Sequence, residues 1–433
     1  MKNTFYIMAI VVIVMVNSLG FAADQAEKGT PFYSQGALYL DWLGFKSGDT
    51  PFFQRLSSRL KLTLWNRPGD GWTVLMDVRD RATLGEAGSN QVILYDARLS
   101  YDSQKNKLFF AIGQMNLYDT VGIGQLTGGS IGYKITKAIA LGGYGGLEPD
   151  VYNSHWDTKY LKYGLFLRYL GTGAKQFALS FNRVVFNSKT ERQYLYSSLL
   201  LPVKTLLVIY GNLEYELGSA TKSQDKLSHL FLNARLNLSK YADVTAHYNT
   251  GRGLDFHRFL LEQSQNPSLQ NLDIERYYYN QTYGVRLSAT PVSNLRLFVE
   301  RRESKQKDLN IHNHSNRFGL SATNIFKSGI SLYGNYTLNR GDDAESNAYY
   351  LSLSRSFGKL SWNLNYANYY NGVRFIGNGT PELFHVPDQK TISSNFFLIL
   401  SKALAVSVEY AYTDQTDASN HQFYLRLIYR KWK

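Results

Sequence analysis

Hydrophobic and polar residues alternate with a period of two along most of the chain after residue 30. In the stretch VLMDVRDR, apolar Val74 and Val78 lie on one side, and Asp77, Arg79 and Arg81 lie on the other. This period is typical of a β-strand with one apolar and one polar face. Repeated segments of about ten such residues, separated by turn residues, are typical of an outer-membrane barrel.

The pattern predicts an all-β fold, a transmembrane antiparallel up-and-down β-barrel of about 22 strands with a range of roughly 18–24. The apolar faces would meet lipid and the polar faces would line the lumen. The strands are expected near 31–45, 53–65, 71–82, 91–102, 106–119, 128–135, 138–146, 158–170, 174–187, 190–201, 205–217, 226–239, 241–251, 274–289, 293–304, 315–325, 328–340, 344–355, 359–370, 390–401, 403–414 and 419–430.

Connections of two lengths alternate between the expected strands. Short turns such as 66–71 alternate with longer polar segments, among them 147–157, 252–273 and 371–389. Outer-membrane barrels have short periplasmic turns and long extracellular loops. We therefore expect the longer segments outside the cell, and loops 252–273 and 371–389 could fold into the lumen. The histidine-bearing stretch 312–314 is expected in a surface loop.

The N-terminus reads as a secretory signal peptide over residues 1–22. Lys2 is followed by the apolar run 7–16, and Ala22 supplies a small residue at the cleavage site. A membrane anchor is the alternative. Residues 23–30 would form a short periplasmic extension and 31–433 the barrel. Cleavage of this peptide and export would place the chain in the bacterial outer membrane, in contact with its lipid.

Charged residues on the expected lumen face are mostly basic, and the whole chain carries a net charge of +13. These charges could neutralise one another across strands; Asp77, for instance, would pair with Arg59 or Arg98. An excess of arginine would instead attract anions or an acidic partner. The residues expected to line the lumen are Arg59, Lys61, Asp77, Arg79, Arg81, Asp96, Arg98, Lys162, Arg168, Arg235, Arg286, Arg296, Arg302, Arg317 and Arg426. In the stretch YDARLSY, Tyr95 is expected on the opposite, lipid-facing side.

Catalytic and metal-binding patterns are weak. The eight histidines are scattered and the chain has no cysteine, which excludes disulfides, thiolate metal sites and covalent c-type haem attachment on this chain. The glycine-rich stretch GIGQLTGG at 122–129 lacks the lysine of a phosphate-binding loop and is expected to be a flexible connection. We expect no enzyme, no cofactor on this chain and no nucleic-acid partner.

Several stretches resemble the porin-type barrels of metal-reducing bacteria, namely WNRPGDGWTVLMDVRDR, QMNLYDTVGIGQLTGG, GGYGGLEPDVY and GNLEYEL. Some barrels of that kind form the sheath of a porin–cytochrome conduit. The resemblance implies a wide pore around a multihaem cytochrome that passes electrons across the outer membrane. The absence of a segment long enough to form a plug domain agrees with a partner in the lumen. The alternatives are a diffusion porin for small anions and an export channel for an anionic polysaccharide.

Overall fold

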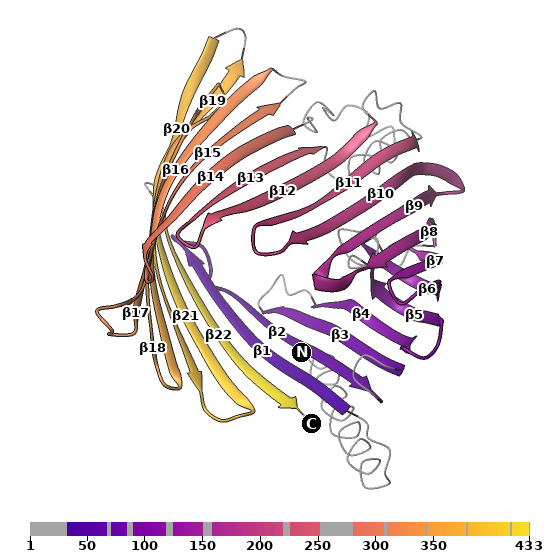
Figure 1. Ribbon diagram of the computed structural model, residues 1–433. Helices are drawn as coiled ribbons and strands as arrows, with labels where there is room; N and C mark the ends of the chain where they lie inside the picture. The colour runs from indigo at the N-terminus through magenta and orange to yellow at the C-terminus, as the bar shows by residue number, and fades with distance from the viewer. Residues whose placement is uncertain are drawn as a thin grey trace. The chain divides into compact units, whose positions relative to one another are not determined.

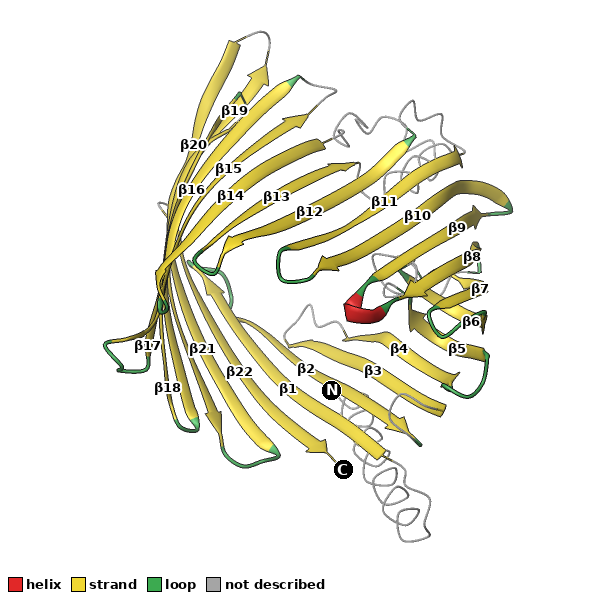
Figure 2. Ribbon diagram, viewed as in Figure 1, coloured by secondary structure: helices red, strands yellow, loops and turns green. Residues whose placement is uncertain are grey.

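A computed structural model describes residues 33–66, 71–84, 90–117, 124–149, 158–219, 226–251, 280–306, 310–342, 344–377, 380–415 and 418–432. Nearly all of them lie in one 22-stranded antiparallel sheet (Figures 1 and 2). Each strand pairs with its neighbours in the sequence, and β1 also pairs with β22. The sheet is therefore closed, and the fold is an up-and-down β-barrel, as the alternation predicts.

The strand bounds agree with the sequence-based ranges to within a few residues over most of the chain. The strands are β1 (Tyr33–Ser47), β2 (Phe53–Trp65), β3 (Gly71–Leu84), β4 (Asn90–Asp102), β5 (Leu108–Asn116), β6 (Gln125–Lys134), β7 (Ile139–Leu147), β8 (Tyr160–Leu170), β9 (Gln176–Phe186), β10 (Lys189–Val203), β11 (Leu207–Ser219), β12 (Leu227–Ser239), β13 (Ala242–Gly251), β14 (Asn280–Val292), β15 (Leu295–Gln306), β16 (Ile311–Ile325), β17 (Ile330–Gly341), β18 (Ala344–Phe357), β19 (Leu360–Gly377), β20 (Thr380–Ile399), β21 (Leu404–Gln415) and β22 (Ala418–Trp432).

The chain divides into two compact units. One comprises residues up to 168 together with 396–410 and 421–433, and the other comprises 169–395 and 411–420. The helical element of the described part is the short turn Thr172–Ala174. No helix among the described residues is long and apolar enough to cross a membrane.

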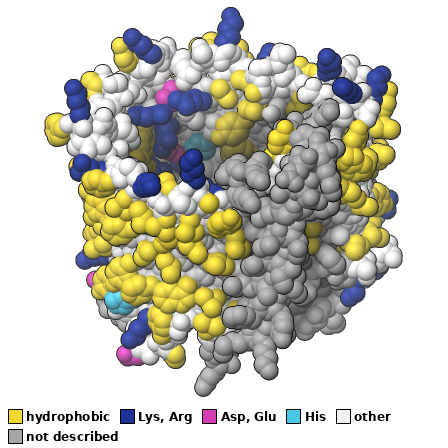
Figure 3. Space-filling model, turned by 90° about the horizontal axis from the view of Figure 1, so that it is seen from below, with side chains coloured by type: hydrophobic (Ala, Val, Ile, Leu, Met, Phe, Trp, Pro, Cys, Tyr) yellow, Lys and Arg dark blue, Asp and Glu magenta, His cyan; other side chains and the backbone are white. Residues whose placement is uncertain are grey.

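Each unit has an apolar face and a polar face. In the first unit Ile112, Ile131 and Leu165 are 60%, 60% and 66% exposed on the apolar face, and in the second Val285 is 54% exposed. Figure 3 shows hydrophobic side chains gathered over much of one side of the molecule. Because large apolar patches on a protein surface mark contact with lipid or another protein, this face is suited to a bilayer.

The predicted loop 371–389 is wrong. β19 continues to Gly377 and β20 begins at Thr380, so these residues are mostly strand. The histidine-bearing stretch 312–314 likewise lies within β16, not in a surface loop, and Gln125–Gly129 of the predicted connection lie within β6. In β6, Leu126 is buried in an apolar cluster and two glycines follow it at 128 and 129, so this part of the strand lacks the alternation of apolar and polar side chains that identifies a strand in a sequence.

Tyr95 lies on the polar face, contrary to the expectation from strict alternation. The pairing of β3 with β4 shifts between Asp77 and Val78, where Tyr95 is an extra residue opposite the β3 ladder. The Arg59 guanidinium lies 4.6 Å from the Tyr95 ring centroid. A β-bulge of this kind adds one residue to a strand and reverses the side on which the next side chains point.

Several sequence-based expectations fall outside the described residues. These are the signal peptide over 1–22, the extension over 23–30 and the loop 252–273; of segment 147–157 the structure describes residues 147–149. They stay predictions.

Candidate functional site

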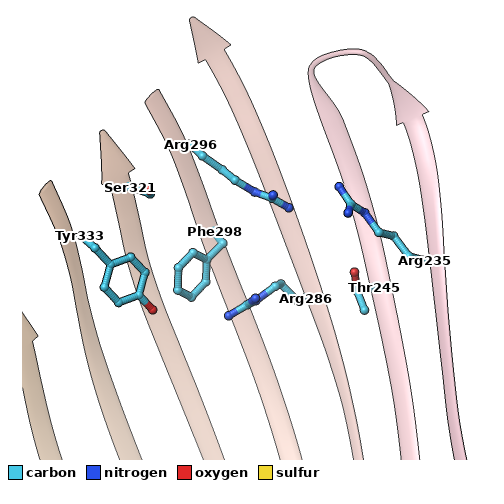
Figure 4. A pocket seen from close by; sticks show the side chains of 7 residues that line it. All are labelled: Arg235, Thr245, Arg286, Arg296, Phe298, Ser321 and Tyr333. Atoms are coloured by element: carbon cyan, nitrogen blue, oxygen red, sulfur yellow. The ribbon is translucent and has the colours of Figure 1, made fainter. Parts of the chain in front are cut away.

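A cavity of about 390 Å³ opens on the polar face of β12–β17. We call it the arginine pocket. Figure 4 shows Arg235 of β12 and Arg296 of β15 reaching toward one another across the intervening strands. The residues that line it are Arg235, Thr245, Arg286, Arg296, Phe298, Ser321 and Tyr333.

Asp243 of β13 is shared by two of these arginines. Arg296 Nη2 donates to both carboxylate oxygens of Asp243, at 3.1 and 2.8 Å, and Arg235 Nη2 donates to one at 3.3 Å. The side chains of Arg235 and Arg296 are still 47% and 41% exposed. One carboxylate cannot neutralise two guanidinium groups, so one positive charge remains accessible beside Asp243.

Glu300 is shared in the same way by the next two arginines. Its carboxylate lies 3.2 Å from Arg286 Nε and 3.2 Å from Arg302 Nη2. All three residues lie on the polar face of β14 and β15, where the register places Arg286 opposite Glu300. A second accessible positive charge follows from this two-to-one pairing.

The aromatic ring of Phe298 contacts two arginines of this surface, Arg286 and Arg317. Its ring lies 4.1 Å from the Arg286 guanidinium and 5.7 Å from that of Arg317, measured to the ring centroid. The ring occupies the space over Gly319, where the Cβ of any other residue would overlap it. Glycine at 319 therefore leaves room for the ring, whose π face attracts both guanidinium groups.

Arg317 meets no carboxylate among the described residues. Its Nη2 donates to the Tyr333 hydroxyl at 3.0 Å. Around the arginine pocket five arginines thus face two acids, Asp243 and Glu300, which leaves three positive charges. Anions are concentrated at such a surface because the charges add up over a short distance.

Sequence-predicted residues of the first unit form a second ionic group on β22 and β1–β4. Arg426 Nε and Nη2 donate to the two oxygens of Asp41, at 2.7 and 3.1 Å. Arg79 lies 3.7 Å from the same carboxylate and donates to Ser57 Oγ at 3.1 Å.

The predicted pair of Arg59 and Asp77 is present in this group. Arg59 Nε and Nη2 donate to the Asp77 oxygens at 2.7 and 2.8 Å, and Lys61 Nζ lies 3.5 Å from the same carboxylate. Arg98 lies 3.5 Å from Asp96. Bidentate contacts fix these guanidinium groups, so much of this charge is engaged within the sheet.

Arg81 is placed differently from its neighbours. It lies close to two other arginines, Arg79 and Arg55, and to the hydroxyl of Tyr95. Arg55 extends the basic stretch of β2 and was not among the sequence-predicted residues. Like charges at close range repel each other and favour any anion that approaches.

Lys162 and Arg168 lie apart from both groups, on β8. Lys162 is 3% exposed and its Nζ donates to Glu148 at 2.9 Å. The Arg168 guanidinium lies 5.1 Å from the Phe109 ring centroid, beside a buried apolar cluster that includes Phe166. These two cations are packed within the sheet rather than gathered at a cavity.

A buried ionic group on β10–β12 contains a residue that the sequence did not reveal. Arg192 Nη2 donates to Glu214 at 3.0 Å and also to Glu216, and its guanidinium lies 4.0 Å from the Tyr194 ring centroid. The three charged side chains are 8%, 7% and 6% exposed. We call it the buried triad.

Asp41 and Arg192 were both missed as polar-face residues. Asp41 lies between Leu40 and Trp42, so the alternation itself could have identified it. Arg192 is followed at the same spacing by Tyr194 and Tyr196. Tyrosine occurs on both faces of a barrel, so this spacing does not reveal which face Arg192 takes.

No group of three or more histidine and acidic residues that could hold a metal ion exists in the described part of the chain. The surface chemistry is that of guanidinium groups, hydroxyls, amides and aromatic rings.

Comparisons with known proteins bear on this chain only weakly. No protein-family model matches it, and no curated protein matches it. Among solved structures, Pseudomonas aeruginosa OccK11 (OpdR) is similar at 11% identity and a TM-score of 0.44, over 93% of this chain and 96% of that one. Pseudomonas aeruginosa OccK7 (OpdD) is similar at 10% identity and a TM-score of 0.44, over 93% and 99%. Acinetobacter baumannii OccAB4 is similar at 10% identity and a TM-score of 0.42, over 93% and 98%.

Proposed function

We propose that the protein is an outer-membrane channel through which small anions diffuse. A closed β-sheet leaves no unpaired edge, which is the condition for a sheet to cross a bilayer. The apolar face, with Ile112, Leu165 and Val285 exposed, would meet the lipid. The polar face would then line an aqueous passage.

The proposed preference for anions rests on the excess of positive charge at the arginine pocket. Three positive charges remain there after Asp243 and Glu300 are counted, and Arg235 and Arg296 are both more than 40% exposed. Rings of basic side chains favour anions in pores because they lower the electrostatic energy of an anion and raise that of a cation.

The test is electrical. The purified full-length protein, reconstituted in a planar bilayer between unequal KCl solutions, should give a reversal potential of the sign set by chloride. A preparation that forms no channels, or channels that prefer potassium, would reject the proposal.

The cytochrome sheath and the polysaccharide export channel stay predictions. A sheath should co-purify in mild detergent with a haem protein in fixed ratio, whereas a diffusion channel should purify without haem. No arrangement of the described residues favours the sheath, so we place the diffusion channel first.

A further inference from the structure

A second cavity, of about 470 Å³, adjoins the arginine pocket on the polar face of β16–β19. Tyr333 lines both cavities, so the two adjoin at this side chain. We call the second one the tyrosine groove. Its other lining side chains include Tyr350, Tyr369, Asn335 and Asn339. Both volumes are in the range of small-molecule sites.

The chemistry of the tyrosine groove differs from that of the arginine pocket. Arg317 is the one charged side chain among its lining residues, and it lies at the junction with the pocket. The remainder are amides, hydroxyls, three tyrosines and an alanine. Such a surface offers many donors and acceptors but little extended apolar area, so it suits a hydroxyl-rich ligand better than a hydrocarbon.

Hydrogen bonds hold two of the three tyrosines, Tyr333 and Tyr350, in place. The Tyr333 hydroxyl accepts from Arg317 at 3.0 Å and from Asn335 Nδ2 at 3.3 Å. The Tyr350 hydroxyl donates to Asn365 Oδ1 at 2.9 Å. With their hydroxyls anchored, these rings need little reordering to receive a ligand, which lowers the entropy lost on binding.

The rings form an aromatic wall. The centroids of Tyr333 and Tyr350 lie 5.9 Å apart with the ring planes tilted by 58°. Tyr369 is 38% exposed on the same surface. The face of an aromatic ring is negative and attracts the positive C–H edges of a ligand. The C–H face of a pyranose ring has that character, and its hydroxyls would meet the neighbouring amides.

We propose that the arginine pocket and the tyrosine groove together bind an acidic oligosaccharide. A uronate carboxylate would lie among Arg235, Arg286 and Arg296, and the adjoining sugar ring would lie against Tyr333 and Tyr350. Guanidinium groups bind carboxylates with paired, charge-assisted hydrogen bonds. This inference rests on the proposed channel function, because the site would lie on the channel wall.

The test uses the full-length protein in planar bilayers with tetragalacturonate as the probe. Maltotetraose is the neutral sugar control, and citrate is a carboxylate without a sugar ring. We expect tetragalacturonate to interrupt the current at a concentration about tenfold lower than either control, since it alone engages both surfaces.

Substitutions locate the interaction. Tyr350→Leu should raise the blocking concentration of tetragalacturonate about tenfold, the effect of losing one aromatic contact, and leave citrate unchanged. Tyr95→Leu, on the polar face outside the groove, is the matched control and should leave both unchanged. Arg235→Gln should raise the blocking concentrations of tetragalacturonate and citrate by the same factor.

Three results would overturn the inference: equal block by citrate and tetragalacturonate, equal block by maltotetraose, or no response to Tyr350→Leu. Failure of the channel proposal has a different signature, because it shows as absent or cation-selective conductance before any sugar is added. Heat-modifiable gel mobility of each variant confirms that it has folded.

Discussion

The buried triad and the arginine pocket, both in the second unit, consist of arginines and acids but differ in their exposure to solvent. In the buried triad two carboxylates share Arg192, and all three side chains are less than 10% exposed. In the arginine pocket, two arginines share Asp243 and are more than 40% exposed. A buried cation surrounded by acids stabilises the sheet. Exposed cations that outnumber the acids can bind an anionic ligand. Arginine content alone therefore does not identify the functional surface.

The largest expected difference between the two groups is in stability. Arg192→Met removes the cation from between Glu214 and Glu216 and leaves two buried carboxylates with no positive charge between them. Breaking a buried ion pair in this way costs about 3–5 kcal/mol. The free energy of unfolding, measured by urea titration of the reconstituted protein, should fall by that amount.

Arg235→Met is the matched control for that change. Its guanidinium is 47% exposed, and Asp243 keeps Arg296 as a partner. The unfolding free energy should then change by less than about 1 kcal/mol. Equal losses in the two variants would remove the distinction between a bracing group and a binding group.

Adding a positive charge to the apolar face, compared with adding it to the polar face, should have the next largest effect on folding. Val285→Arg places a cation on the apolar face, which costs about 2–4 kcal/mol near the middle of a bilayer. Ser321→Arg adds the same charge to the arginine pocket and should fold normally. The fraction of heat-modifiable, folded protein after membrane insertion measures both; poor folding of Ser321→Arg alone would reverse the face assignment.

Asp243→Asn sharpens the comparison through selectivity rather than stability. Removing one negative charge about 5 Å from a passing anion raises the local anion concentration about fourfold at low salt, by Coulomb's law in water. The chloride-to-potassium permeability ratio should rise accordingly. Glu216→Gln removes the same charge from the buried triad and should leave the permeability ratio unchanged; an equal rise in both variants would contradict the assignment of selectivity to the arginine pocket.

Tyr333→Phe should have the smallest effect. It removes the hydroxyl that accepts from Arg317 and Asn335, at 3.0 and 3.3 Å. Each of these two hydrogen bonds contributes about 0.5 kcal/mol, the low end of the usual range, because both donors are partly exposed and can turn to water. We expect a urea midpoint close to that of the unsubstituted protein with unaltered conductance; a loss of conductance would assign Tyr333 a role in holding the passage open.

Most of the fold could be predicted from the sequence, because one apolar face repeats in every strand. The range 53–65 for β2 is the clearest example, since the structure gives the same bounds. The alternation failed where turn-forming residue types interrupt it. Residues 371–377 continue β19, although Asn371 and Gly372 mark a turn in the sequence.

Bulges were the second obstacle. Tyr95 was assigned to the wrong face because one extra residue in β4 shifts the pairing beside Asp77. A shift also occurs between Thr190 and Arg192 in β10. No residue type in these stretches marks a bulge, so counting by twos cannot find it.

The candidate site could be predicted only as a list of inward residues. Arg296 and Arg426 read alike in the sequence, yet Arg426 is held bidentately by Asp41 from the other end of the chain. Arg296 instead shares Asp243 with Arg235. Which cation is left in excess depends on cross-strand partners, and those are known only once register and side-chain positions are known.

The most direct measurement of the central claim is the reversal potential of one triple variant. Arg235→Gln, Arg286→Gln and Arg296→Gln together remove three positive charges, which equals the excess of arginines over acids at the arginine pocket. A second variant, with Lys137, Lys240 and Lys402 each changed to Gln, removes the same charge from exposed turns. In a KCl gradient across a planar bilayer, the pocket variant should lose its preference for chloride and the turn variant should keep it. Equal reversal potentials for the unsubstituted protein and the pocket variant would contradict the assignment of anion selectivity to this surface.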